Sequence, residues 1–130
     1  MSKIIIVSGP VIVENNKVLL NKDKKDNFWK FCGGQVKDED SNLKATAQRE
    51  AQEEMSIDIE ILDDTPYLFY SEKEKDEIKI SVVLVHFLAR RIGEIIPGTD
   101  IQDWRWIDIN NLDSESLAPN IRPTLKHFGF

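Results

Sequence analysis

The chain has 130 residues, a formal net charge of −6 at pH 7 and a single cysteine. This length favours one domain over residues 1–130 with a core of its own. The acidic balance argues against a nucleic-acid polymer as partner, because nonspecific binding to its backbone needs clustered Lys and Arg. One cysteine excludes an intrachain disulfide and a cysteine-based zinc site, and it fits a reducing compartment.

The apolar run Ile4-Ile5-Ile6-Val7 is short, and Gly9-Pro10 follows it closely. The run lacks the small-residue cleavage site of a signal peptide, and no segment has the apolar length of a membrane span. We therefore expect no membrane association and a cytoplasmic location. His86 and His127 lie far apart and make no spaced ligand pair, so each is expected to be an ordinary strand or terminal residue.

The first part of the chain predicts β-structure, from short runs of β-branched residues separated by turn residues. The predicted elements are strands at Ile4–Val7 and Val11–Val13, a turn at 14–16 and a strand at Lys17–Leu20. A polar loop at 22–26 and an aromatic stretch at 27–31 then lead to Gly33-Gly34.

A helix is predicted from Asn42 to Met55, with Asp40 or Ser41 as its N-cap. Steps of four, three and four place several side chains on one stripe of this helix. The stripe begins apolar and ends acidic: Leu43, Ala47, Glu50 and Glu54.

The second half of the chain alternates between predicted strands and polar turns. The elements in order are strands at Ile57–Leu62 and Tyr67–Tyr70, a charged turn at 71–76, a long buried strand at Ile78–Arg90, a turn region at 93–98, a strand at Trp104–Ile107, and a short terminal helix ending at Lys126. Strands split around one long helix, with a second helix at the end, predict an α/β fold with a mixed sheet between helical layers.

The acidic end of the predicted helix indicates a metal site. Glu53 lies three residues after Glu50, so that Glu50, Glu53 and Glu54 can come within reach of one another. Three neighbouring carboxylates stay ionised only with a cation among them, and an oxygen-only cluster suits magnesium or manganese. The alternative is a solvated acidic face, which is what most Glu-rich helices are.

Together, the glycine pair, the acid that follows it and the run Arg49-Glu50-Ala51-Gln52-Glu53-Glu54 resemble the Nudix hydrolase pattern G-x5-E-x7-R-E-U-x-E-E-x-G-U, where U is aliphatic. The chain departs from this pattern in its loop and at its end. Asp40 replaces the first Glu, eight residues rather than seven separate Asp40 from Arg49, and Ser56 replaces the final glycine. Cys32 stands where the family commonly has proline. These departures concern loop geometry more than the metal-binding acids.

The resemblance implies an α/β/α sandwich over essentially the full chain and a catalytic centre with Mg²⁺ as cofactor, with Mn²⁺ as the alternative. It implies catalytic roles for Arg49, Glu50, Glu53 and Glu54, with the three glutamates and the Gly33 carbonyl as metal ligands. Asp100 lies where a loop carboxylate often completes such sites in the family. Asp103 and Glu94 are alternatives to Asp100. For each of the three, a solvated acid in a turn without a metal role is an equally good interpretation.

Several residues are candidates for substrate binding. Lys22, Lys24 and Lys30 could approach phosphates, and Gly34 lets the backbone come close to a ligand. Phe31 and its aromatic neighbours could stack on a base or pack in the core. Asn120 resembles the base-reading asparagine of 8-oxo-dGTP diphosphatases, although a helix cap explains it equally well.

The resemblance implies a small-molecule nucleotide substrate, and the compact length favours cleavage of a nucleoside triphosphate to a monophosphate and pyrophosphate. Alternatives within the family are hydrolysis of ADP-ribose, of a nucleoside diphosphate sugar or of a dinucleoside polyphosphate. A non-catalytic nucleotide-binding module and a purely structural acidic domain are the other interpretations. The oligomeric state is left open between monomer and homodimer.

Overall fold

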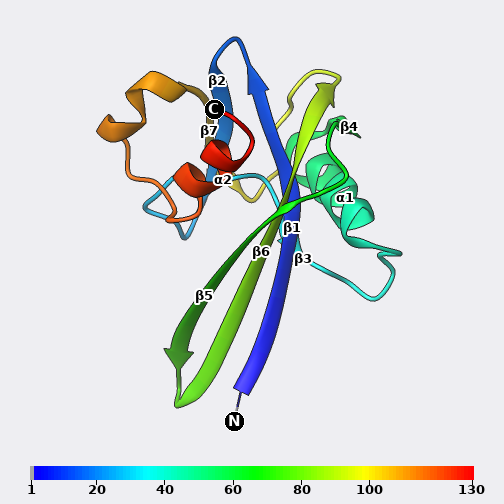
Figure 1. Cartoon of the computed structure of the whole chain (residues 1–130). Helices are drawn as coiled ribbons and strands as arrows, with labels where there is room; N and C mark the ends of the chain where they lie inside the picture. Colours follow the sequence, from blue (N-terminus) through cyan, green and yellow to red (C-terminus); the bar gives the residue numbers. More distant parts are fainter. Residues whose placement is uncertain (1) are drawn as a thin grey trace.

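The computed structural model describes residues 2–130 and shows a mixed β-sheet with helices on both faces (Figure 1). The strands are β1 (Ser2–Glu14), β2 (Lys17–Asp23), β3 (Gly34–Gln35), β4 (Asp58–Ile61), β5 (Tyr67–Lys75), β6 (Ile78–Ile92) and β7 (Ile101–Asp108). The helices are α1 (Leu43–Met55), the 3-10 helix η1 (Ile109–Ser114) and α2 (Ile121–His127). None of the helices within residues 2–130 has both the length and the apolar character needed to cross a membrane.

The sheet has the strand order β4-β6-β1-β2-β7, with β3 paired to β1 and β5 paired to β6. β1 and β6 run parallel over most of their length, and the remaining pairs are antiparallel. The short β3 pairs with β1 at Val7 and Ser8, which fixes the glycine loop to the middle of the parallel β1–β6 pair.

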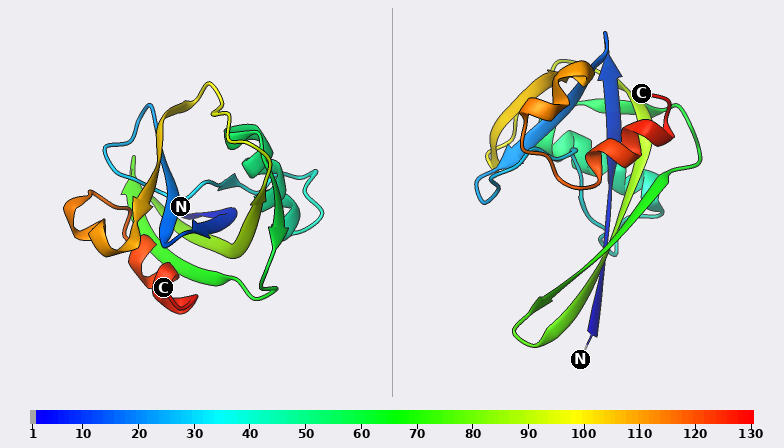
Figure 2. Two further views of the ribbon diagram at one scale, coloured as in Figure 1. Left: turned by 90° about the horizontal axis from the view of Figure 1, so that it is seen from above. Right: turned by 60° about the vertical axis from the view of Figure 1, so that its left-hand side comes forward.

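Two hydrophobic cores lie on opposite faces of this sheet, as the alternation of side chains along a strand requires. Ile12 packs with the buried residues of α1, whereas its neighbour Val11 packs with Ile121 and Leu125 of α2. Viewed from above, α1 lies on one side of the strands, and η1 and α2 lie on the other (Figure 2). The predicted α/β fold with a mixed sheet between helices is therefore confirmed.

The prediction of two strands interrupted at Gly9-Pro10 was wrong, because β1 is continuous from Ser2 to Glu14. β1 pairs with β3 only at residues 7 and 8 and with β2 only at residues 13 and 14. Between these two contacts, at residues 9–12, β1 is hydrogen-bonded to β6 alone. Proline is tolerated where one side of a strand lacks a ladder, so Pro10 does not end the strand.

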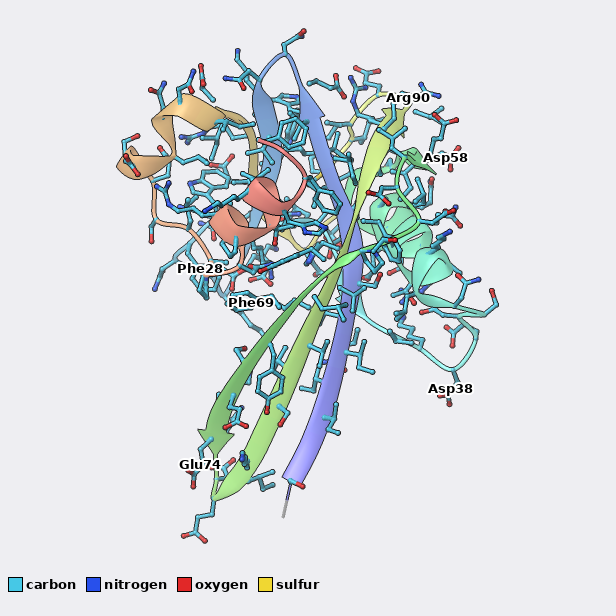
Figure 3. All side chains as sticks on the ribbon, viewed as in Figure 1. Phe28, Asp38, Asp58, Phe69, Glu74 and Arg90 are labelled. Atoms are coloured by element: carbon cyan, nitrogen blue, oxygen red, sulfur yellow. The ribbon has the colours of Figure 1, made fainter. Side chains whose placement is uncertain are left out.

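The expected turn at 71–76 was also too long, because β5 continues to Lys75 and only Asp76 and Glu77 form the turn, both with positive φ. Positive φ at both central residues is the geometry of a tight hairpin. β5, the first half of β6 and the start of β1 extend beyond the helices as a ribbon (Figure 1), with Glu74 near its end (Figure 3). The first half of β6 is consequently only partly buried, contrary to the expectation of a well-buried strand.

Glycine at position 9 allows the glycine loop to lie directly on β1. A Cβ at Gly9 would lie 1.9 Å from the carbonyl oxygen of Cys32, well inside the closest approach of real atoms. Gly33, which follows Cys32, has a φ of 155° and also lies against the β1 backbone. The loop can therefore occupy this position only because Gly9 has no Cβ atom.

The variant Gly9→Ala is expected to destabilise the fold by about 3 kcal/mol, because two backbone segments would have to separate. Urea denaturation followed by circular dichroism measures this loss. Gly93→Ala is the matched control, since nothing lies within 4 Å of a Cβ there and only its φ of 105° opposes the exchange. An equal loss at the two positions would contradict the steric explanation.

Candidate active site

The N-cap of helix α1 lies further along the chain than either predicted cap residue. Asn42 is the N-cap, and its Oδ1 accepts a hydrogen bond from the Ala45 N–H at 2.8 Å. The prediction that Asp40 or Ser41 caps the helix was therefore wrong. The Asp40 carboxylate is instead directed toward the middle of α1, where Thr46 Oγ1 donates to it at 2.8 Å.

Arg49 and Asp40 form a bidentate ion pair that closes the loop between β3 and α1. Nε of Arg49 lies 2.9 Å from Oδ1 of Asp40, and Nη2 lies 3.0 Å from Oδ2. Nη2 also donates to the carbonyl of Gln35 at 3.0 Å. The Asp40 side chain is only 4% exposed, and its hydrogen bonds from Arg49 lower its pKa far below the usual value. A shorter acid and one extra loop residue thus still allow the brace to form.

Glu50 is buried against the glycine loop. Its two carboxylate oxygens lie 2.4 Å from the place where a Cβ of Gly34 would stand, so that only glycine fits there. Burial raises the pKa of Glu50, although the Arg49 charge acts in the opposite direction. Nη1 of Arg49 lies 3.4 Å from the Glu50 carboxylate. Gly34 therefore provides space for a carboxylate of this chain rather than for a direct approach of ligand to backbone.

Glu54 is held at the other end of the same loop. Its Oε1 accepts a hydrogen bond from the Gly33 N–H at 3.1 Å, and Nδ2 of Asn21 lies 3.5 Å away. Burial raises the pKa of Glu54 to about 7, although the Gly33 bond acts to lower it. A carboxylate that is costly to ionise in this position gains from any cation placed beside it.

Glu53 points outward, and its Oε2 lies 3.2 Å from Nη1 of Arg49, the same nitrogen that contacts Glu50. Within residues 2–130, no three His, Cys, Asp or Glu side chains form a ready-made metal cluster. The guanidinium of Arg49 serves as the cation for two of the three glutamates here. Like-charged groups need such a neighbour.

Asp100 reaches the glutamates because the loop before β7 is attached to the end of α1. The N–H of Gly98 donates to the Glu54 carbonyl at 2.8 Å, and the N–H of Ile96 donates to the Met55 carbonyl at 2.9 Å. A small cavity of about 130 Å³ results, with Asp100 and the three glutamates in its lining. Its residues are Glu50, Glu53, Glu54, Gly98, Thr99, Asp100 and Ile101. The alternatives Asp103 and Glu94 do not line it.

A larger cavity of about 420 Å³ adjoins the first and shares Glu54, Asp100 and Ile101 with it. Its other lining residues are Asp23, Lys24, Lys25 and Lys30. Nζ of Lys30 lies 2.9 Å from Asp23 and 2.8 Å from Asp26. Burial alone would lower the pKa of Lys30, but these carboxylates outweigh it and raise the pKa. Acidic and basic side chains therefore line one connected hollow.

Lys22 is not among the residues that line these two cavities. Its ammonium lies 4.6 Å from the centroid of the Trp29 ring, in a cation–π contact. Trp29 itself is 2% exposed and belongs to the core on the α2 side.

A third cavity, of about 350 Å³, lies on the α2 face of the sheet. It brings together Lys30, Phe31 and Asn120, which the sequence suggested as substrate-binding residues. The other lining residues are Val7, Phe28, Phe69, Ser71, Lys73, Leu84, His86, Ala118 and Pro119. Phe28 and Phe69 are labelled in Figure 3, below α2. His86 and Phe69 were missed because assigning them to this face needs the register of β5, β6 and β1.

Ser56 ends α1 in the left-handed conformation that the family pattern reserves for glycine, with φ 61° and ψ 29°. Its Oγ donates to the carbonyl of Ile96 at 2.8 Å. This bond joins the end of α1 to the loop that carries Asp100, and it offsets the conformational cost of a side chain at this φ.

Replacement of Ser56 by alanine is expected to lower the free energy of unfolding by about 1 kcal/mol, because the bond is lost and the strained φ remains. Ser56→Gly loses the same bond but relieves the backbone, and its change is expected to stay within about 0.5 kcal/mol. Chemical denaturation of both variants gives the comparison. A glycine variant less stable than the alanine variant would contradict this account.

The Asp40 pKa shift predicts a pH-dependent stability. Because the folded-state pKa of Asp40 lies below the usual aspartate value of 3.8, its contribution to stability is present above that pH and is lost as the pH falls through the folded-state pKa. Thermal unfolding between pH 7 and pH 3 should show a smaller decline for Asp40→Asn than for the unchanged chain. Asp38→Asn, at an exposed position of the same loop, is the control. Parallel declines in Asp40→Asn and the unchanged chain would contradict the shift.

Several solved structures share this fold. The solution structure of the E. coli ORF135 protein is 23% identical, with a TM-score of 0.69 over 98% of this chain and 89% of that one. The MutT NUDIX hydrolase from Burkholderia pseudomallei is 20% identical, with a TM-score of 0.71 over 95% and 96%. A C. elegans Ap4A hydrolase in a binary complex is 18% identical, with a TM-score of 0.73 over 95% and 94%. No curated protein sequence matches the chain significantly.

The sequence profile of the NUDIX domain matches residues 5–128. This range includes the glycine loop, the acidic end of α1 and the loop that carries Asp100. The profile covers nearly the whole chain, and the shared fold agrees with it. The chain belongs to the Nudix hydrolase family.

Proposed function

We propose that this protein is a divalent-metal-dependent hydrolase that cleaves a nucleoside triphosphate to a nucleoside monophosphate and pyrophosphate. One observation carries the proposal: the cavity lined by Glu50, Glu53, Glu54 and Asp100 opens into the cavity lined by three lysines. Phosphoryl transfer requires both groups of residues close together, acids for a metal and bases for phosphate oxygens.

The donor set fits magnesium or manganese, because every candidate ligand is a hard oxygen. Glu54 is the strongest candidate ligand, since it is buried and already oriented by the Gly33 N–H. Glu50 is the next, with a share in the role of general base, and Glu53, Asp100 and the Gly33 carbonyl complete the set. A bound metal would offset the charge on phosphate oxygens and make water nucleophilic.

Arg49 is proposed to position the acids rather than to touch the substrate. Each nitrogen of its guanidinium already donates to an acceptor of the chain: Nε to Asp40, Nη1 to Glu50 and Glu53, and Nη2 to Gln35 and Asp40. Asp40 alone satisfies two of its nitrogens. Arg49 therefore joins the glycine loop, the N-terminal loop of α1 and the acidic face into one unit.

Lys30 supports a nucleotide as substrate because it lines both the lysine cavity and the cavity on the α2 face. A molecule with phosphates at one end and a flat apolar ring at the other can occupy both. Phe28 and Phe31 offer aromatic surface for the ring, and Asn120 offers an amide. Nucleic-acid polymers are not proposed, given the net charge of −6.

Structures of the same fold include an Ap4A hydrolase and a UDP-X diphosphatase. Dinucleoside polyphosphates and nucleoside diphosphate derivatives are therefore the competing substrates. One lysine cavity beside one ring-sized cavity favours a substrate with a single base. Product analysis over a panel of nucleoside triphosphates, ADP-ribose, nucleotide sugars and dinucleoside polyphosphates separates these activities.

Glu54→Gln is expected to reduce metal-dependent turnover about 100-fold or more, because a neutral amide cannot offset the metal charge. Phosphate and pyrophosphate release is measured with and without Mg²⁺, and the melting temperature checks the fold. Glu94→Gln is the matched control at an exposed acid that lines neither cavity. Full activity in Glu54→Gln would remove Glu54 from the site, and nucleotide binding without turnover in the unchanged chain would indicate a non-catalytic module.

A further inference from the structure

The direction of His86 follows from the register of three strands. On β6, Leu84 and His86 share one face, whereas Val85 packs on the α1 side. Leu84 lies opposite Val7 of β1 and Phe69 of β5, so these side chains share its face. Val7, Phe69, Leu84 and His86 all line the α2-side cavity, and Asn120, the residue before α2, lines it as well.

Two polar side chains of this cavity, those of His86 and Asn120, are buried and make no hydrogen bond within the part of the chain that the structure describes. His86 is 4% exposed and Asn120 is 3% exposed. Burial alone lowers the pKa of His86 to about 4, with no charged or hydrogen-bonding group contributing. Asn120 makes no side-chain cap to α2. Within residues 2–130, the one side-chain oxygen or nitrogen that is sealed from solvent and unpaired is Oδ1 of Asn21. The polar atoms of His86 and Asn120 therefore open onto the cavity.

An apolar residue would be the ordinary choice at position 86 if packing were its only role. The His86 ring lies 4.9 Å from the Phe31 ring, centroid to centroid, and phenylalanine could make that contact. Burying an imidazole without a partner costs free energy that a hydrogen-bonding ligand would restore. We therefore expect the unpaired His86 imidazole to make its hydrogen bonds with a ligand.

The chemistry of the lining selects the ligand class. A neutral imidazole has one donor and one acceptor, and an amide has both as well. Neither neutral group can offset a phosphate charge, and the charge of Lys30, a lysine of this cavity, is already paired with Asp23 and Asp26. Aromatic walls with neutral donors and acceptors suit an uncharged flat heterocycle.

We propose that His86 is a specificity-determining residue that reads the hydrogen-bonding edge of a nucleobase in this cavity, beside Asn120, whose base-reading role the family resemblance already implies. The proposal rests on the proposed function only in taking the ligand to be a nucleotide. His86 contacts the base and has no part in the cleavage step.

Equilibrium binding of AMP, GMP, CMP and UMP without metal tests the proposal. The unchanged chain is expected to prefer one base by about tenfold or more, and His86→Phe is expected to bring the four affinities within about threefold. His86→Gln keeps a donor and an acceptor and is expected to retain part of the preference. His127→Phe makes the same exchange at the other histidine, which stacks on Tyr67 and does not line the cavity, and should change nothing.

Ribose 5-phosphate, which has no base, separates base reading from a general loss of binding. Its affinity is expected to be equal in the unchanged chain and in His86→Phe. A preserved base preference in His86→Phe, or a parallel loss of ribose 5-phosphate binding, would overturn the proposal. So would equal affinity of the unchanged chain for all four nucleotides, or no binding at all.

These measurements need no turnover, so the two proposals can fail separately. Base discrimination without metal-dependent hydrolysis would refute the proposed function and leave the role of His86 intact. If His86→Phe does not fold, as judged by its melting temperature, His86→Met supplies the same comparison.

Discussion

The close contact of the glycine loop with β1 on one side and α1 on the other is the constraint on which the site depends. Gly9 lets the Cys32 carbonyl approach β1, and Gly34 leaves room for the Glu50 carboxylate. Gly33 then directs its N–H at Glu54. Because these three residues are glycines without a Cβ atom, the carboxylates of Glu50 and Glu54 are buried beside the glycine loop, and burial raises their pKa values. A cation placed beside such acids would offset the cost of ionising them.

Electrostatic pairing compensates for the departures of this chain from the family pattern. Asp40 is shorter than glutamate and stands one residue further from Arg49, yet the bidentate pair forms, with Thr46 and the Lys37 N–H as additional donors to Asp40. Ser56 adopts a conformation typical of glycine, and its hydroxyl attaches α1 to the loop before β7. Both departures therefore leave the acidic end of α1 and Asp100 facing the same cavity.

The arrangement of the cavities connects the fold with the proposed substrate. The acidic and lysine-lined cavities share Glu54 and Asp100, and Lys30 joins the lysine cavity to the apolar cavity on the α2 face. Under the proposed function, chemistry and recognition belong to different elements: α1 and the loops carry the charged groups, whereas β6 carries His86 and the residue before α2 is Asn120. If the proposed base subsite is correct, exchanges there alter specificity without disturbing the acids.

Local sequence was enough to predict α1, the Asn15-Asn16 turn and the acids on the helix, because helical spacing and turn residues act over a few positions. The resemblance added the α/β/α arrangement and the association of Asp100 with the glutamates. The continuity of β1 through Pro10, the length of β5, the neighbours of Lys22 and the exposure of His86 to a cavity were decided by the tertiary structure. Each depends on which strand pairs with which and in what register, and those contacts join residues far apart in the chain.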